Sequence, residues 1–274
     1  MSLRNILVTV DTGKSCAQRL DYALALAARH DAHLTGLYVH DTTDIPGYVV
    51  SQLTEAAVKA HDEALAEIRA QTQATFDEAV GRAGYSARSE WRSELGDPTQ
   101  ITAVLSRYFD LTVAGQWDPD SDEEQIPPED LVLASGRPVL IVPHSFSLRT
   151  MGEHAIVAWN GSREGARAVA DAMPILEATK DVTVLVVNPD RTMGDTPGSA
   201  IALHLARHGI NAEAAHITSR DIDVGDVLLN NVSDRGADIV VMGGYGTPRL
   251  RELIMGGMTR SILKHMTVPV LMSH

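Results

Sequence analysis

The sequence predicts an α/β protein with two tandem, doubly wound, open parallel-sheet domains of the Rossmann-like kind. Short apolar strands alternate with helix-like segments, this order occurs twice along the 274 residues, and both copies end in similar strands. Strands that are apolar on both faces are typical of buried parallel strands, and the helices between them imply right-handed crossovers. We therefore expect domains at 1–146 and 152–274, with a short polar linker between them.

Both copies begin with a strand, a polar turn, an alanine-rich helix and a second strand. Asp11 in the first turn aligns with Asn160 in the second. The copies also end alike, because 110–115 matches 238–243 and both closing strands contain Pro-Val-Leu. The first copy has an additional polar helix at about 51–81, for which a solvated face is the simplest interpretation. In the second copy we expect strands near 155–160, 182–188, 212–218, 238–243 and 267–272, and helices near 162–177, 197–208, 224–235 and 257–266.

The formal net charge is −13 and is unevenly distributed. Residues 1–150 hold 22 acidic and 12 basic side chains (−10), whereas residues 151–274 hold 14 and 11 (−3). An acidic chain repels phosphate backbones, which argues against nucleic acid as a partner and favours the second half for an anionic ligand. No apolar run reaches the roughly 18 residues that span a membrane, and no signal-peptide pattern precedes the first strand. We therefore expect a cytoplasmic protein.

A cluster of glycines follows the predicted strand at 238–243. Ligands of open α/β sheets bind at the carboxyl ends of strands where the strand order reverses, and Asn160 is expected at the same edge. Backbone N–H groups without a nearby Cβ cradle phosphate well, and a helix N-terminus adds partial positive charge. A turn that merely packs tightly is the alternative interpretation. The cluster consists of Gly243, Gly244, Gly246, Gly256 and Gly257, with Arg249 or Arg251 within reach of a phosphate.

The spacing of these glycines fits neither the P-loop nor the dinucleotide fingerprint. It does fit the pattern G-x2-G-x9-G, from Gly243, Gly246 and Gly256. Together with the turns at Asp11 and Asn160 and the two closing Pro-Val-Leu strands, this pattern makes the chain resemble the universal stress protein family in its tandem two-domain form.

The resemblance implies the adenine-nucleotide alpha-hydrolase-like fold and binding of ATP or AMP in the second domain. It implies that the adenine base lies near Asn160 and Val187, and that the phosphates lie near the glycine backbones and Arg249. The sequence departs from the family pattern at Gly257, where Ser or Thr is usual, with Thr259 two residues further on, and at Asn160, where Asp is usual. The residues assigned to the site are Asn160, Val187, Met242, Gly243, Gly244, Gly246, Arg249, Gly256, Gly257, Met258 and Thr259.

The first domain departs further from this pattern. Residues 115–125 replace the glycine loop and carry five acidic side chains, which would repel a triphosphate. We predict that the first domain keeps the fold and has lost the nucleotide site. Calcium binding by these acidic residues is not favoured, because their spacing is not that of an EF-hand.

The other chemistry-bearing residues have simpler interpretations. Ser15 and Ser162 are expected to cap helices, and Cys16 to be a small residue buried on a helix. No histidine spacing requires a metal, although His204 and His208 would share one helix face. No base is paired with a nucleophile, so we do not expect an enzyme. A core role is expected for the methionines Met242, Met255, Met258, Met266 and Met272.

The closing strands are apolar and of the edge type, and an unpaired edge is a liability. In the resembled family these strands pair between domains, which implies an internal pseudo-dimer and leaves a homodimer of chains open. The leading hypothesis is a stress-response sensor or regulator that binds an adenine nucleotide and an unknown protein partner. The alternatives are a nucleotide-free dimerising scaffold with vestigial sites, and an enzyme such as an adenylating enzyme or an electron-transfer flavoprotein subunit.

Overall fold

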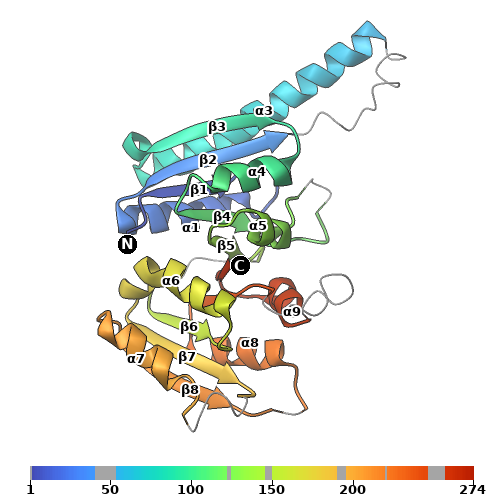
Figure 1. Cartoon of the computed structure of the whole chain (residues 1–274). Helices are drawn as coiled ribbons and strands as arrows, with labels where there is room; N and C mark the ends of the chain where they lie inside the picture. Colours follow the sequence, from blue (N-terminus) through green and yellow to red (C-terminus); the bar gives the residue numbers. More distant parts are fainter. Residues whose placement is uncertain are drawn as a thin grey trace.

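Figure 1 shows the computed structural model of the chain, in which helices cover an extended sheet. The structure describes residues 2–40, 54–121, 125–145, 150–189, 196–219, 221–245 and 257–274. The N-terminal unit contains β1 (Asn5–Thr9), α1 (Cys16–His30), β2 (His33–His40), α3 (Glu55–Ala83), β3 (Ser89–Leu95), α4 (Pro98–Ser106), β4 (Leu111–Gly115), α5 (Pro128–Ala134) and β5 (Val139–Val142). The C-terminal unit contains β6 (His154–Ala158), α6 (Arg163–Glu177), β7 (Asp181–Val187), α7 (Ser199–Arg207), β8 (Ala212–Ile217), α8 (Val224–Arg235), β9 (Ile239–Gly243), α9 (Gly257–His265) and β10 (Val270–Ser273).

The strands form one ten-stranded sheet in the order β3-β2-β1-β4-β5-β10-β9-β6-β7-β8. Each unit supplies five neighbouring strands that pair in parallel, and the predicted α/β class with a mostly parallel open sheet is confirmed. In the C-terminal unit every predicted element begins and ends within three residues of the observed one. The largest difference is the last strand, which begins after Pro269 because proline has no N–H for a ladder.

The two units join through β5 and β10, which pair in antiparallel fashion with Leu140 opposite Leu271. The expectation that the closing strands pair between the units is therefore met. Both strands are buried along their whole length. Closing strands that cover each other in this way leave neither as an exposed apolar edge.

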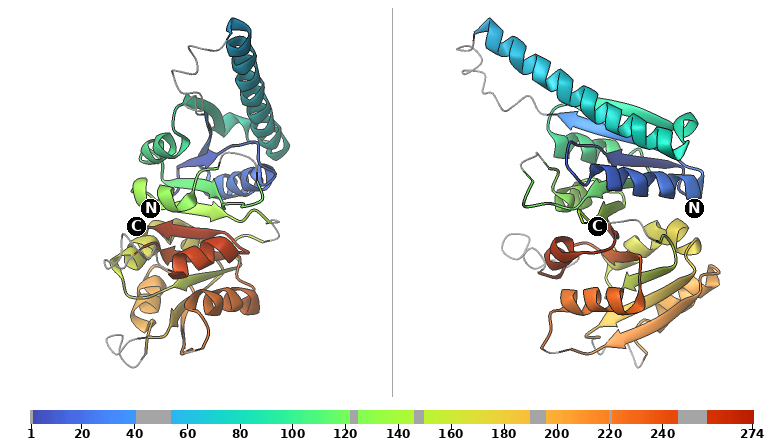
Figure 2. Two further views of the ribbon diagram at one scale, coloured as in Figure 1. Left: turned by 90° about the vertical axis from the view of Figure 1, so that its right-hand side faces the viewer. Right: turned by 180° about the vertical axis from the view of Figure 1, so that it is seen from behind.

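Helices cover both faces of the continuous sheet, as the two views of Figure 2 show. On one face α1, α3, α6 and α7 pack on a core that contains residues of both units. On the other face α4, α5, α8 and α9 pack on a second core that is also shared. The faces are set by strand alternation, because Leu140 and Val142 contribute to the first core while Val139 and Ile141 contribute to the second.

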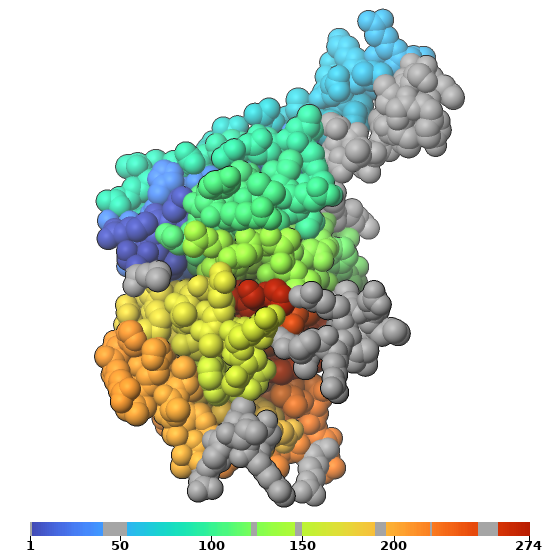
Figure 3. Space-filling view, in the orientation of Figure 1, coloured from blue at the N-terminus to red at the C-terminus, as the bar shows by residue number. Residues whose placement is uncertain are grey.

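The prediction of an additional helix in the first copy is wrong, because α3 connects β2 to β3 in the same way that α7 connects β7 to β8. Helix α3 differs from α7 in its length, 29 residues against 9, and it projects from the body of the molecule (Figures 1 and 3). Thr54 caps its first turn, since the Thr54 side chain accepts a hydrogen bond from the Ala57 N–H, and Gly84 ends it at φ 64°. Its buried residues lie only in the second half, and the first half keeps the solvated surface that the sequence predicted. The buried residues are Thr72, Phe76, Ala79 and Val80.

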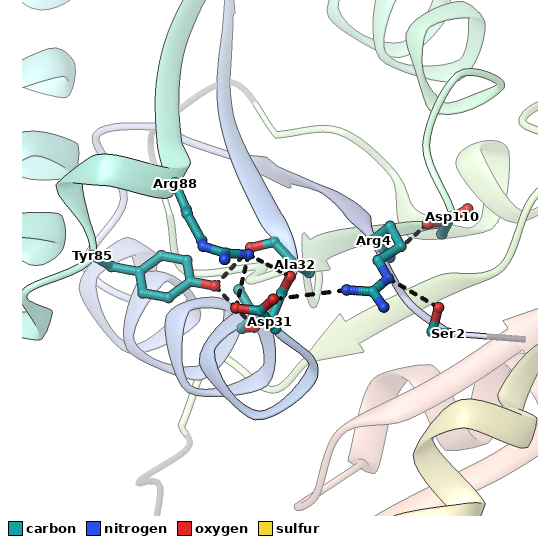
Figure 4. Close-up of polar contacts among 8 residues, drawn as sticks. Ser2, Arg4, Asp31, Ala32, Tyr85, Arg88 and Asp110 are labelled. Carbon is teal, nitrogen blue, oxygen red and sulfur yellow. Dashed lines mark hydrogen bonds and ion pairs between the residues drawn. The ribbon is translucent and has the colours of Figure 1, made fainter.

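Equivalent aspartates before β4 and β9 show that the repeat is preserved in three dimensions. Asp110 Oδ2 accepts hydrogen bonds from the backbone N–H groups of Arg4 (2.8 Å) and Asn5 (3.0 Å). Asp238 Oδ2 accepts from the Glu153 N–H at 2.8 Å. Figure 4 shows the N-terminal contact beside a second cluster, in which Arg4 and Arg88 both form ion pairs with Asp31 at the end of α1. Each aspartate therefore ties the start of its unit to that unit's fourth strand.

Candidate functional site

The predicted site residues come to the carboxyl ends of three neighbouring strands in the C-terminal unit. β6 lies between β7 and β9, and the chain runs from β6 first to one side and later to the other. This is the point of strand-order reversal where open α/β sheets bind ligands. Asn160 follows β6, Val187 ends β7, and Met242 and Gly243 end β9.

Other predicted site residues lie around the glycine segment. Gly244 follows β9 directly, and Gly257, Met258 and Thr259 form the first turn of α9. Part of the prediction concerns the chain between these two ends and lies outside the described residues. These residues are Gly246, Arg249, Arg251, Met255 and Gly256.

Asn160 occupies an exposed position with one half of its amide engaged. Its Oδ1 accepts a hydrogen bond from the Ser162 N–H at 3.1 Å. Among the described residues, no acceptor pairs with its Nδ2, so the NH₂ group can donate two hydrogen bonds to a ligand. An aspartate at this position would offer acceptors only. Asn160 therefore presents donors where the usual family residue presents negative charge.

The two described glycines at the end of β9 are both explained by packing. A Cβ on Gly243 would stand 2.5 Å from the Gly165 amide nitrogen, in the first turn of α6. A Cβ on Gly244 would stand 2.9 Å from Cγ1 of Val132, which belongs to α5 of the N-terminal unit. Side chains at these positions would require backbone movement or repacking. A tightly packed turn, the alternative to a phosphate cradle, therefore accounts for these two glycines.

Gly257 differs from them because it opens α9 at an exposed position, and among the described residues no atom lies within 4 Å of where its Cβ would stand. The first N–H groups of a helix have no partner within the helix, so α9 begins with donors at this edge of the sheet. Thr259, by contrast, is only 6% exposed, and its side chain packs toward the interior. Gly257 is thus the position of this turn that is open to a ligand.

Apolar members of the predicted site belong mainly to the core. Met242 is 3% exposed, and Met258 and Val187 are partly buried against the same core cluster. Met266 and Met272 are buried in that cluster as well, so the expected core role is confirmed for the four methionines within the described residues. These side chains form the core on which the candidate site residues are placed.

Glu164 is a buried carboxylate beneath the site that sequence reasoning did not single out. It lies in the first turn of α6, and its side chain is only 4% exposed. Burial alone would raise its pKa, but the pKa is lowered because the carboxylate accepts a hydrogen bond from Arg163 and its own backbone N–H and lies near His274. Negative charge at a helix N-terminus is also favourable. Glu164 is thus part of the α6 turn against which Gly243 packs.

The two serines predicted as helix caps behave differently. Ser162 caps α6, because its Oγ accepts a hydrogen bond from the Gly165 N–H at 3.0 Å. The prediction for Ser15 is wrong, since its side chain makes no capping hydrogen bond with α1. The physical reason is backbone conformation: Ser162 is extended (ψ 161°), as a capping residue requires, whereas Ser15 is helical (ψ −6°).

In the N-terminal unit the equivalent turn is filled by an arginine. Arg19 is 3% exposed, and it donates from Nε to the Thr9 carbonyl (2.8 Å) and from Nη2 to Asp11 Oδ2 (2.5 Å). Asp11 Oδ1 accepts from the Gly13 N–H at 3.0 Å, so both carboxylate oxygens are satisfied within the chain. The Arg19 guanidinium also fills the space beside Gly115 that a side chain would need. Asp11 therefore has a structural role here.

A cavity of about 210 Å³ adjoins this turn at the carboxyl ends of β1, β2 and β4. Its polar wall includes Asp11, Lys14 and Gln116, and its apolar wall includes Leu65 and Ile68 of α3. The loop below holds Asp118 in a ring with Gln125, whose amide donates to the Asp118 carbonyl and accepts from the Asp118 N–H, both at 2.7 Å. The loss of the nucleotide site in this unit stays a prediction.

Other predictions concern metals, membranes and the cysteine. No group of three metal-ligating side chains occurs in the part of the chain that the structure describes, and the His204 and His208 rings meet edge to face at 4.8 Å. No helix in the described ranges is long and apolar enough to cross a membrane. Cys16 is buried at the start of α1, as expected, and burial raises the pKa of its thiol.

One known protein family matches the chain in two segments, one in each copy of the repeat. The universal stress protein family matches residues 2–116 and 151–274. The chain belongs to the universal stress protein family. The first match ends at Gln116, where the N-terminal unit loses the glycine pattern, whereas the second match includes the whole glycine segment. No curated protein sequence matches the chain significantly.

Solved structures support the fold over the full length. A universal stress protein from Archaeoglobus fulgidus DSM 4304 is 17% identical, covers 98% of this chain and 96% of its own, and superposes with a TM-score of 0.73. A functionally unknown protein from Pseudomonas aeruginosa PAO1, also 17% identical, covers 99% of this chain and 92% of its own, with a TM-score of 0.61. The two-unit arrangement thus recurs in distant proteins.

Proposed function

We propose that this universal stress protein binds an adenine nucleotide, ATP or AMP, in its C-terminal unit and acts as a stress-response sensor or regulator through a protein partner. The observation that carries the proposal is the combination of two features at one sheet edge. The Asn160 NH₂ group has no acceptor among the described residues, and α9 begins at Gly257, where none of those residues lies close by. The donors suit acceptor nitrogens or hydroxyls of a nucleoside, and the helix N-terminus suits phosphate. The less acidic half of the chain holds this edge.

Titration of the full chain with ATP and with AMP by calorimetry tests the proposal. We expect one site in the micromolar range, weakened by Gly246→Val within the glycine pattern and by Asn160→Ala. Gly81→Val, at an open position on α3, serves as the control for a glycine-to-valine change. Absence of binding heat for either nucleotide, with the protein folded, would reject the proposal.

Gly257→Ser provides a test in the opposite direction. It restores the Ser or Thr that the family pattern has at this position, and the open space around Gly257 accommodates the new side chain without a clash. If phosphates rest on this turn, the added hydroxyl strengthens binding by roughly the 0.5–1.5 kcal/mol of one hydrogen bond. Unchanged or weaker affinity would argue that phosphate does not lie at the start of α9.

A nucleotide-free scaffold is the second candidate, and one observation favours it. Gly243 and Gly244 are required by packing against α6 and α5, so their presence does not depend on a ligand. This function predicts that the purified protein carries no nucleotide, and that Asn160→Ala changes neither stability nor assembly. Nucleotide content after mild purification, measured by absorbance of the acid-soluble fraction, distinguishes the two candidates.

A further inference from the structure

Gln116 of the N-terminal unit holds the end of a helix in the C-terminal unit. It follows β4 and is 4% exposed. Its Nε2 donates to the Leu263 carbonyl at 2.8 Å and to the Lys264 carbonyl at 3.1 Å, in the last turn of α9. Its Oε1 accepts from the His144 N–H at 3.0 Å. The side chain is thus buried, fully hydrogen-bonded and fixed in orientation.

This contact satisfies groups that α9 cannot satisfy by itself. The last carbonyls of a helix have no partner within it, and a buried carbonyl without a donor is costly. α9 has nine residues and is therefore only about 13 Å long. Its C-terminal end is held by Gln116, and its other end opens at Gly257 toward the proposed site. Because the helix is short, a shift of its C-terminal end also moves its N-terminal end at Gly257.

Gly244, the equivalent residue of the other unit, has no side chain with which to repeat the Gln116 contact. Gln116 and Gly244 are equivalent, because their N–H groups donate to the closing strand of their own unit, at Val142 (2.8 Å) and Ser273 (2.9 Å). At Gly244 a side chain would collide with Val132 of α5, whereas at Gln116 the side chain passes to α9. The N-terminal unit therefore acts on α9 through a side chain that has no counterpart in the other unit.

The other described end of the glycine segment also rests on the N-terminal unit. Gly244 lies against Val132 of α5. The pKa of Tyr245 is raised by burial and by the charges of Glu129 and Asp130, which also belong to α5. Tyr245 packs on the core cluster that α5 and α9 share. Both described ends of the segment, at 244–245 and at α9, are thus in contact with the unit whose own glycine pattern is lost.

We propose that the N-terminal unit positions the C-terminal site, with Gln116 as the positioning residue that sets α9. The part that concerns ligand affinity rests on the proposed function. The part that concerns α9 does not, because it follows from the contacts of Gln116 alone.

The test compares Gln116→Leu with Gln125→Leu in the full chain. Both changes remove a buried or half-buried side-chain amide of the N-terminal unit that makes at least two hydrogen bonds. Among the described residues, the Gln125 amide bonds to Asp118 and not to α9. Amide hydrogen exchange is followed in α9 and in α8, and the same proteins are titrated with ATP. We expect exchange in α9 to rise about 5- to 30-fold in Gln116→Leu, with less change in α8 and none in Gln125→Leu. ATP affinity should fall in Gln116→Leu only.

Four results are decisive. Unchanged α9 exchange in Gln116→Leu, or an equal rise in Gln125→Leu, would overturn the proposal. Faster α9 exchange with unchanged ATP affinity would overturn the link to the site. Faster α9 exchange in a protein that binds no ATP even as wild type would overturn the proposed function and support the positioning of α9 by Gln116.

Discussion

Gly243 at the end of β9 lies directly against Gly165 in the first turn of α6, so close that a Cβ on Gly243 would stand 2.5 Å from the Gly165 amide nitrogen. Backbone atoms on both sides form this contact, and neither can move aside as a flexible side chain would. The glycine cluster that first pointed to a ligand therefore contains residues with a structural requirement. The requirement can be measured separately from ligand binding.

Gly243→Ala should destabilise the protein by roughly 2–4 kcal/mol, because β9 must separate from α6 to admit the methyl group. Gly257→Ala should be neutral or slightly stabilising, since the position is open and alanine is the better helix former by about 1 kcal/mol. Urea unfolding of both variants measures the difference. Equal stabilities would show that the contact relaxes easily and that packing does not require Gly243.

Asp11→Asn should be strongly destabilising because it leaves the buried Arg19 guanidinium without its charge partner. Loss of one partner of a buried pair costs about 3–5 kcal/mol, and partial exposure of Asp11 brings the expected loss to about 2–3 kcal/mol. The matched change in the other unit, Asn160→Asp, should alter stability little, because Asn160 is exposed and makes one local hydrogen bond. Similar losses in both variants would contradict the structural role of Asp11.

The lowered pKa of Glu164 predicts a specific loss of stability in acid. A carboxylate whose pKa is lower in the folded protein stabilises it fully above the ordinary value of about 4.3, and this contribution disappears as the pH falls through the folded pKa. In Glu164→Gln, the free energy of unfolding should therefore fall less steeply as the pH drops below the ordinary value of about 4.3. Glu177→Gln, on the exposed end of the same helix, is the matched control for removal of a carboxylate.

Tyr245 should ionise only at high pH, because burial and the charges of Glu129 and Asp130 raise its pKa to about 12, against the opposing effect of Arg260. A raised pKa stabilises the folded state fully below the ordinary tyrosine value of about 10, and this contribution is lost as the pH rises through about 12. Ultraviolet titration of wild type minus Tyr245→Phe isolates this residue. Glu129→Gln should lower the measured pKa, and an ordinary value in the wild type would place Tyr245 away from α5.

The element order and the repeat were predictable because they depend on local patterns. Strand alternation, helix periodicity and turn residues act over a few positions, and the duplicated order of these patterns predicted the parallel sheet and the closing strands. The error at Ser15 has a local cause of another kind. A serine before a helix is a frequent cap, but its backbone conformation, which the sequence does not show, decides whether the hydroxyl reaches the free N–H groups.

The site was predictable only in part. Asn160 and the end of β9 were predicted as site residues because a polar turn and glycines follow apolar strands, and their part in binding stays a prediction. Glu164 and Gln116 were missed because nothing in their neighbouring residues distinguishes them from surface side chains. A signal was nevertheless present for Gln116, since it stands at the position that aligns with Gly244 in the repeat.

The sequence by itself determined the class of fold, the two repeats and their family, and it predicted the strand edge that we propose for a ligand. The tertiary structure decided which glycines are needed for packing, how Arg19 fills the first turn and how Gln116 joins the units. Gln116 and Leu263 are 147 positions apart, and only the pairing of β5 with β10 brings them together. Local patterns specify elements, whereas burial and hydrogen bonding between distant residues depend on how those elements pack.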